Sequence, residues 1–186
     1  IQEAFDDAVE ALRRAGLSPV EITLPDLPVE SAAWVIVVAE GSASFETIFS
    51  RGLDREMSDP DAPLFSGLSK LVRASDYLKA LRVRTLALEA YAELLGEVDA
   101  IVSLNLPFTA APAEGNLSDY FAGSDPIGGA GNLCGLPAMA VPCGFGSDGL
   151  PVSLHFTAGA MEDRKALALG RLYQSVTDWH TRKPPI

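Results

Sequence analysis

The chain has 186 residues, of which 48% are apolar and 21% charged, and its 25 acidic and 14 basic side chains give a net charge of −11. The apolar content excludes a disordered chain, and no collagen-like or coiled-coil period is present. Clustered Lys and Arg supply most of the affinity for nucleic acid, so the acidic balance excludes nucleic acid as a direct partner. No apolar run approaches the ~20 residues of a membrane-spanning helix. We therefore expect one globular domain over residues 1–186 and no membrane partner.

The first predicted element is a helix that ends at Gly16, a residue suited to the position just after a helix. Its apolar side chains recur at helical spacing and are Phe5, Ala8, Val9, Leu12 and Leu17. Val20, Ile22 and Leu24 then alternate with polar residues, which predicts a short strand closed by Pro25.

A second helix is expected to begin near Ser31 and to continue past Gly41 to Phe49. Residues 34–39 are apolar on every side, so we expect this helix to be well buried. Residues 52–68 are rich in Asp, Pro, Gly and Ser, which is typical of a loop.

A long helix is predicted from about residue 75 to residue 95, followed by a buried strand over residues 98–104. Residues 107–137 are rich in Pro and Gly and are expected to be irregular.

Residues 138–143 and 152–157 flank Asp148-Gly149, which predicts a β-hairpin, and a last helix is predicted over residues 162–176. Helices and strands interleave, and at least one strand pair is a hairpin. The sequence therefore indicates an α/β fold with a mixed sheet and flanking helices.

The sequence alone offers little catalytic chemistry. It has no Gly-x-Ser-x-Gly elbow, and His155 and His180 are its only imidazoles, which are too far apart to suggest a metal site. His155 shares a strand face with Ser153 and Thr157, and a polar strand face is normally solvated or part of an interface. We expect no metal and no cofactor.

Two further features have ordinary structural interpretations. Cys134 and Cys143 are expected to be buried free thiols of a reducing compartment, so we expect a cytoplasmic protein. The glycine cluster at residues 128–131 could present backbone amides to an anion, but no Lys or Ser/Thr completes a phosphate loop. Close backbone packing or turns with positive φ are the favoured interpretation of the cluster.

A longer pattern is more specific. Residues 131–145 read Gly-Asn-Leu-Cys-Gly-Leu-Pro-Ala-Met-Ala-Val-Pro-Cys-Gly-Phe, and residues 148–152 read Asp-Gly-Leu-Pro-Val. This order resembles the C-terminal part of amidase-signature enzymes, which carry an Asn-Leu-x-Gly-x-Pro-Ala strand, a Pro-Cys-Gly-Phe turn and a Gly-Leu-Pro-Val strand. Further stretches that resemble the family are residues 39–46, 77–85, 98–102 and 177–185.

The resemblance implies a hydrolase that cleaves carbon–nitrogen amide bonds with a Ser–cis-Ser–Lys triad located in the N-terminal half of the family's enzymes. This chain has no Ser-Ser dipeptide, and its lysines lie in polar or helical surface contexts: Lys70, Lys79, Lys165 and Lys183. We therefore expect no catalytic residue within residues 1–186. The chain, which begins at Ile1, would be a C-terminal fragment that is inactive alone, its catalytic part lying upstream.

The resemblance also suggests substrate-binding residues. In the glutamine-using members an Asp placed like Asp125, seven residues before Asn132, contacts the substrate's amino group. This implies that Asp125 contacts substrate and that Gly131 and Asn132 line or support the same region. Asp125 could equally be an ordinary loop acid, and a buried Asn132 could instead hold loop backbone in place.

Two departures from the family's pattern bear on the substrate. Ser103-Leu104-Asn105 stands where the family often has Thr-Pro-Thr, and His155 replaces a frequent Gln. Residues 52–74 are too divergent to locate the Arg that binds glutamine's carboxylate. These differences favour a general amidase over a tRNA amidotransferase A subunit.

The expected partners are a small-molecule amide substrate and the missing N-terminal half of the same protein. A face left without that half would expose strand edges and apolar side chains, which could support a homodimer. Two alternatives stay open: a non-catalytic binding or scaffold domain derived from amidases, and part of a glutamine-dependent tRNA amidotransferase A subunit.

Overall fold

A computed structural model describes residues 1–114 and 127–184. The chain divides into two compact units, one formed by Ile1–Pro25 with Ala90–Ile186 and the other by Asp26–Glu89. We call them the sheet unit and the helical unit. Within the described residues no helix is long and apolar enough to cross a membrane. That residues 1–186 form one domain stays a prediction.

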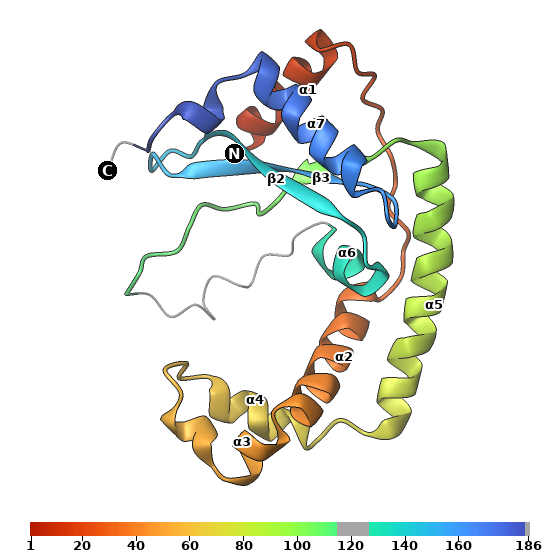
Figure 1. Cartoon of the computed structure of the whole chain (residues 1–186), viewed down its shortest axis with the longest axis vertical. Coiled ribbons are helices and arrows are strands. Elements are labelled where there is room, and N and C mark those ends of the chain that lie inside the picture. The colour runs from red at the N-terminus through yellow and green to blue at the C-terminus, as the bar shows by residue number, and fades with distance from the viewer. Residues whose placement is uncertain (115–126, 185–186) are drawn as a thin grey trace. The chain divides into compact units, whose positions relative to one another are not determined.

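The sheet unit is built on three strands in the order β1-β3-β2 (Figure 1). They are β1 (Ile101–Leu104), β2 (Ala138–Phe145) and β3 (Pro151–Thr157). Both pairings are antiparallel. The α/β class with flanking helices is confirmed, whereas the described strands include no parallel pair. β1 begins three residues later than the predicted strand.

The predicted hairpin is confirmed at β2 and β3. Gly149 takes φ +79°, and its N–H donates to the Gly146 carbonyl at 3.0 Å. The Asp148 carboxylate accepts the Leu150 N–H at 3.0 Å, which closes the turn from the side-chain side. Asp and Gly thus supply the two features that this turn needs, a local acceptor and a residue free to adopt positive φ.

Two helices cover one face of the sheet, α1 (Gln2–Arg14) and α7 (Asp163–Val176) (Figure 1). The α1 side chains that pack inward lie at helical spacing, and those of β3 lie at every second position. Together they form a core of Ala8, Ala11, Leu12, Val141, Cys143, Val152, Leu154, Phe156 and Tyr173. Both helices were predicted within a few residues of their ends.

Gly16 ends α1 as expected, with φ +91°. The Leu17 N–H donates to the Leu12 carbonyl at 3.1 Å and the Gly16 N–H to the Arg13 carbonyl at 3.0 Å. This is the Schellman arrangement, which satisfies two carbonyls that the helix leaves open.

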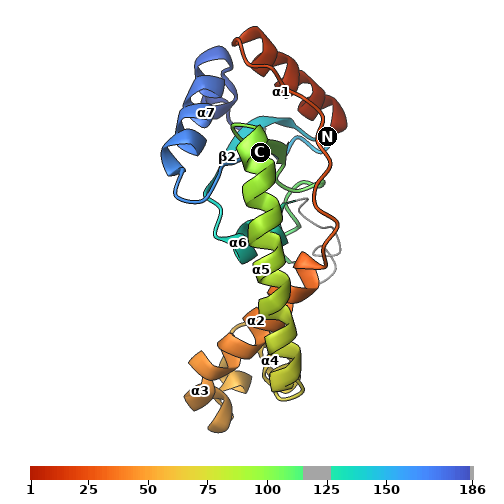
Figure 2. The ribbon, with the colours of Figure 1, turned by 90° about the vertical axis from the view of Figure 1, so that its right-hand side faces the viewer.

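The helical unit contains α2 (Val29–Ser44), α3 (Glu46–Ser50), the 3-10 helix η1 (Leu53–Glu56) and α4 (Ala62–Ser69). The long predicted helix is confirmed as α5 (Ala74–Glu97), whose N-terminal part belongs to this unit (Figure 2). The loop expected over residues 52–68 was wrong, since it holds η1 and most of α4. Pro63 lies in the first turn of α4, where a missing N–H costs nothing.

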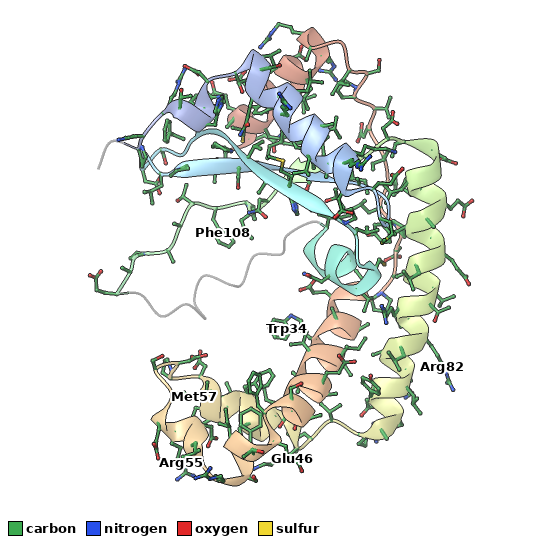
Figure 3. The ribbon with its side chains drawn as sticks, in the orientation of Figure 1. Trp34, Glu46, Arg55, Met57, Arg82 and Phe108 are labelled. Carbon is green, nitrogen blue, oxygen red and sulfur yellow. The ribbon has the colours of Figure 1, made fainter. Side chains whose placement is uncertain are left out.

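The expectation of a well-buried second helix was also wrong. The helix is interrupted at Phe45, and Ala32 is the buried side chain of α2. Trp34 is 58% exposed and Val37 52% exposed, and Trp34 projects from the side of α2 (Figure 3). A helix that is apolar all round needs neighbours on every side, and the described part of this unit covers only some sides of α2.

Two local predictions were wrong in the sheet unit. Residues 18–26 form no strand, because no described strand pairs with them. The stretch predicted as irregular contains α6 (Gly128–Cys134), so the glycine cluster is helical and does not form turns with positive φ. A short 3-10 helix, η3 (Trp179–Thr181), follows α7, and the Trp179 ring meets Phe145 edge-on with centroids 5.8 Å apart.

Candidate functional site

The site suggested by the sequence centres on α6. Asp125 lies outside the described residues, whereas Gly131 and Asn132 both belong to this helix. Ala130, Leu133 and Cys134 are its buried face, at spacings of three and four residues. α6 lies on the side of the sheet opposite α1 and α7 (Figures 1 and 2). Packing of these buried side chains holds α6 in place, and Asn132 lies on the exposed face of the helix.

The C-terminal turn of α6 is closed by Gly135, which takes φ +65°. The Leu136 N–H donates to the Gly131 carbonyl at 2.9 Å, and the Gly135 N–H donates to the Asn132 carbonyl at 3.4 Å. A Cβ at Gly131 would meet no described atom within 4 Å. Packing within the described chain therefore gives no reason for a glycine at position 131.

The Asn132 side chain is exposed, and its Nδ2 donates to the Gly128 carbonyl at 2.9 Å. The bond lies within α6 and the side chain is not buried, so it is not the contact to loop backbone that the alternative interpretation of Asn132 expected. The bond uses one of two amide hydrogens, so the other hydrogen and the carboxamide oxygen stay available for a ligand.

The sheet face opposite the core carries a polar group of side chains; the sequence placed His155 and Thr157 on one strand face but did not bring Ser103 to them. Ser103 of β1 lies directly opposite His155 of β3, and Thr157 lies two residues further along the same face. Ser103 Oγ, His155 Nδ1 and Thr157 Oγ1 are buried, and none has a hydrogen-bond partner among the described residues. Ser103 and His155 belong to the two stretches where the sequence departs from the amidase-signature pattern.

This juxtaposition follows from the pairing of β1 with β3. The hairpin sequence shows that residues 153, 155 and 157 share a face, but no local signal identifies β1 as the second neighbour of β3.

The segment after β1 is held to the hairpin turn. The Thr109 hydroxyl donates to Asp148 Oδ2 at 2.5 Å. This hydrogen bond is the main reason that the pKa of Asp148 lies below its ordinary value, with the Leu150 N–H as a second cause. The contact holds Thr109, near the end of the first described range, against the hairpin turn.

The helical unit has a cavity of about 370 Å³ lined in part by Glu40, Arg73 and Tyr77. The Tyr77 hydroxyl donates to Glu40 Oε1 at 2.8 Å, which raises the pKa of Tyr77. Arg73 belongs to the divergent stretch 52–74, and its guanidinium is paired with Asp76 at 2.8 Å. Arg73 is therefore engaged by a carboxylate of its own chain.

The thiols and lysines lie as expected. Cys134 and Cys143 are buried and neither forms a disulfide, and burial raises the pKa of Cys143 to about 11. Lys70, Lys79 and Lys183 are exposed. Lys165 is half-buried and lies 2.9 Å from Glu162 Oε2 and 3.8 Å from Asp99 Oδ1. In the described ranges no group of three His, Cys, Asp or Glu side chains could hold a metal.

Comparison with known proteins identifies the family. The model of the family described as Amidase matches residues 1–167. The chain belongs to the amidase family. An amidase of Pseudomonas putida is 29% identical over 198 residues, which cover 100% of this chain and 41% of that enzyme. The glutamyl-tRNA(Gln) amidotransferase A subunit of Chloroflexus aggregans is 31% identical over 210 residues, covering 100% of this chain and 43% of that protein.

A solved structure extends the amidase comparison to the fold. The glutamyl-tRNA(Gln) amidotransferase A subunit of Thermotoga maritima superposes with a TM-score of 0.68 at 25% identity, covering 95% of this chain and 39% of that one. This amidase-family chain thus spans about two-fifths of the length of these three relatives.

Proposed function

We propose that this chain is the C-terminal part of an amide hydrolase that cleaves carbon–nitrogen bonds by a Ser–cis-Ser–Lys mechanism whose residues lie outside the chain. The observation that carries the proposal is the match of the amidase family over residues 1–167, with an amidase among the relatives. The lack of a Ser-Ser dipeptide and the surface positions of three of its four lysines support placing the triad elsewhere.

In this proposal the chain shapes the substrate cleft and completes the central sheet. Asp125 would bind a substrate amino group through its carboxylate, while Gly131 and Asn132 would line the wall of the cleft. The support comes from α6, whose exposed face carries the free oxygen and remaining hydrogen of the Asn132 carboxamide. A carboxamide offers one donor and one acceptor to an amide substrate, which has the complementary groups.

The proposal includes a cytoplasmic location. Its support is that the two buried cysteines form no disulfide, which suits a reducing compartment.

The first experiment compares residues 1–186 with the longer polypeptide encoded by the same gene. Both are purified and assayed for ammonia release from small primary amides. We expect the longer polypeptide to hydrolyse the amides and residues 1–186 to be inactive. Hydrolysis that co-elutes with residues 1–186 would refute the placement of the triad. A longer polypeptide that binds amides without cleaving them would favour the scaffold alternative.

The second experiment tests Asp125 in the longer polypeptide. Loss of a hydrogen bond to a charged group costs about 1.5–3 kcal/mol, which corresponds to a rise in KM of roughly 10- to 100-fold. Asp125→Asn should show this rise for substrates that carry an amino group and no change for substrates that lack one. Asp26→Asn, an exposed acid of the helical unit, is the matched control. Equal KM values for the two variants would exclude the contact.

A second candidate is the A subunit of a glutamine-dependent tRNA amidotransferase, favoured by the relatives of that name at 31% and 39% identity. It predicts ammonia release from glutamine in preference to other small amides. A general amidase would instead cleave amides without an α-amino acid group at equal or higher rates.

A further inference from the structure

Ser103, His155 and Thr157, which we call the polar row, fit neither of the usual environments of a strand face. A face covered by protein is normally apolar, and a face in water normally has its polar atoms exposed. Ser103 Oγ, His155 Nδ1 and Thr157 Oγ1 are instead buried, without a hydrogen-bond partner among the described residues. Buried polar atoms in folded proteins nearly always have such a partner. The polar row therefore has the character of a surface that a ligand completes.

The neighbouring strand β2 leaves room beside the polar row. Ala140 lies directly opposite His155, and Ala138 lies directly opposite Thr157. Both alanines are exposed, and their short side chains keep this part of the sheet face low. Ser103 and His155 are themselves half-buried, so part of each side chain is accessible. A ligand that lies on the two alanines therefore reaches the edge of the His155 ring.

The described elements around this surface carry no fixed charge. The sequences of β1, β2, β3 and α6 contain no Asp, Glu, Lys or Arg. Burial of a charged group is costly unless an opposite charge lies beside it. A hydroxyl group and a neutral imidazole each offer both a donor and an acceptor. The surface therefore suits an uncharged group that also donates and accepts, such as a carboxamide.

The polar row and α6 lie on the same side of the sheet (Figure 1). The Ala158 N–H donates to the Pro137 carbonyl at 3.0 Å, which ties the chain between α6 and β2 to the end of β3. This bond lies one residue beyond Thr157, so α6 is held near that end of the polar row. The exposed carboxamide of Asn132 thus belongs to the same side of the sheet as His155.

We propose that Ser103 and His155 form a subsite for a second, uncharged polar group of the amide substrate, remote from the bond that is cleaved, so that the enzyme prefers diamides to amides with an apolar end. The proposal rests on the proposed function, since it takes the amide substrate as the ligand. Thr157 is 1% exposed, so the contacts are assigned to the other two side chains. Ser103 and His155 also belong to the stretches where the sequence departs from the family's pattern, which is where a substrate preference particular to this chain would reside.

Three small amides test the proposal on the longer polypeptide encoded by the same gene. Butanediamide carries a second carboxamide, its half-acid carries a carboxylate in the same place, and pentanamide has a chain of the same length with an apolar end. Imidazole nitrogen NMR follows each addition over a time too short for appreciable hydrolysis, with the His155 signals identified by their loss in His155→Phe. Butanediamide should shift the His155 signals and bind more tightly than the other two amides, whereas the signals of His180, an exposed imidazole of η3, should stay unchanged.

Two results would overturn the proposal. One is an absent response of His155 to butanediamide, which is the result expected if a further segment of the polypeptide covers the polar row. The other is a dissociation constant for the half-acid or for pentanamide as low as that for butanediamide. Neither result depends on a variant that folds.

Variants at position 155 separate a ligand contact from a structural role. Loss of one hydrogen bond to the ligand should raise the dissociation constant of butanediamide roughly 3- to 10-fold in His155→Phe and leave that of pentanamide unchanged. His155→Gln, which keeps a donor and an acceptor, should restore most of the affinity for butanediamide. His180→Phe is the matched control and should change neither value. An equal loss of affinity for both amides in His155→Phe would contradict the subsite, and Ser103→Ala repeats the comparison if that variant does not fold.

Binding and ammonia release, measured on the same samples, keep the two proposals apart. Binding of butanediamide at His155 without ammonia release would refute the proposed function and leave the subsite in place. Ammonia release from butanediamide and pentanamide at equal kcat/KM, without a response at His155, would do the reverse.

Discussion

Gly144 of β2 lies against α1 so closely that it provides a sharp test of the packing between the sheet and this helix. A Cβ at position 144 would lie 2.8 Å from the Ala4 Cβ. Carbon atoms in good contact are about 3.5–4.0 Å apart, so Gly144→Ala falls short by about 1 Å. An alanine side chain cannot rotate away, and the helix or the strand must move. Overpacking of this kind costs about 1–3 kcal/mol, and each kcal/mol lowers Tm by roughly 2–4 °C in a chain of this size.

Urea and thermal unfolding of four proteins measure this cost: the wild type, Gly144→Ala, Ala4→Gly and the double variant. Ala4→Gly alone should cost about 0.5–1 kcal/mol through helix propensity. When Ala4 is already replaced by Gly, Gly144→Ala should cost at least about 1 kcal/mol less than it costs in the wild type. Gly131→Ala is the control, because a Cβ there meets nothing within 4 Å. The predicted clash would be refuted if the losses of unfolding free energy of the two single variants add up in the double variant. It would also be refuted if Gly144→Ala destabilises the protein no more than the control does.

Three further predictions concern a thiol, a turn and an exposed ring. Burial raises the pKa of Cys143 from 9.0 to about 11, so the unfolded chain loses this proton at lower pH than the folded chain. The free energy of unfolding should therefore fall as the pH rises between these two values. Urea unfolding at pH 8 and pH 10.5 should show a smaller fall in the free energy of unfolding for Cys143→Ala than for the wild type. Gly149→Ala should cost about 1–2 kcal/mol, because φ is +79° there, and an unchanged urea midpoint would contradict the strain. Trp34→Gln should change stability by less than about 0.5 kcal/mol, since Trp34 is 58% exposed, and should lower self-association in sedimentation if this face forms dimers.

The sequence predicted best where the signal is local. Gly16 ends α1 because the residue there needs positive φ, and Asp148-Gly149 closes the hairpin because both residues act within the turn itself. The α7 helix and the long α5 helix also follow from periodicity within one segment. None of these predictions depends on which other element lies nearby.

The wrong predictions depended on neighbours. Alternation in Val20–Leu24 specifies which side of the segment is apolar, whereas a strand also needs another strand to bond to. The all-apolar run of α2 indicates that burial is favourable, but it does not supply the covering surface. In the candidate site, the position of Ser103 opposite His155 depends on strand order, which the hairpin alone does not determine.

Two of the wrong predictions concern groups that lack a covering neighbour in the described chain. Val20–Leu24 has the pattern of a strand and remains unpaired, and Trp34 has the character of a core residue and remains 58% exposed. A folded chain rarely leaves peptide groups unpaired and large apolar side chains exposed in the same molecule. The alternation at residues 20–24 and the apolar character of Trp34 therefore indicate burial that the described residues do not supply.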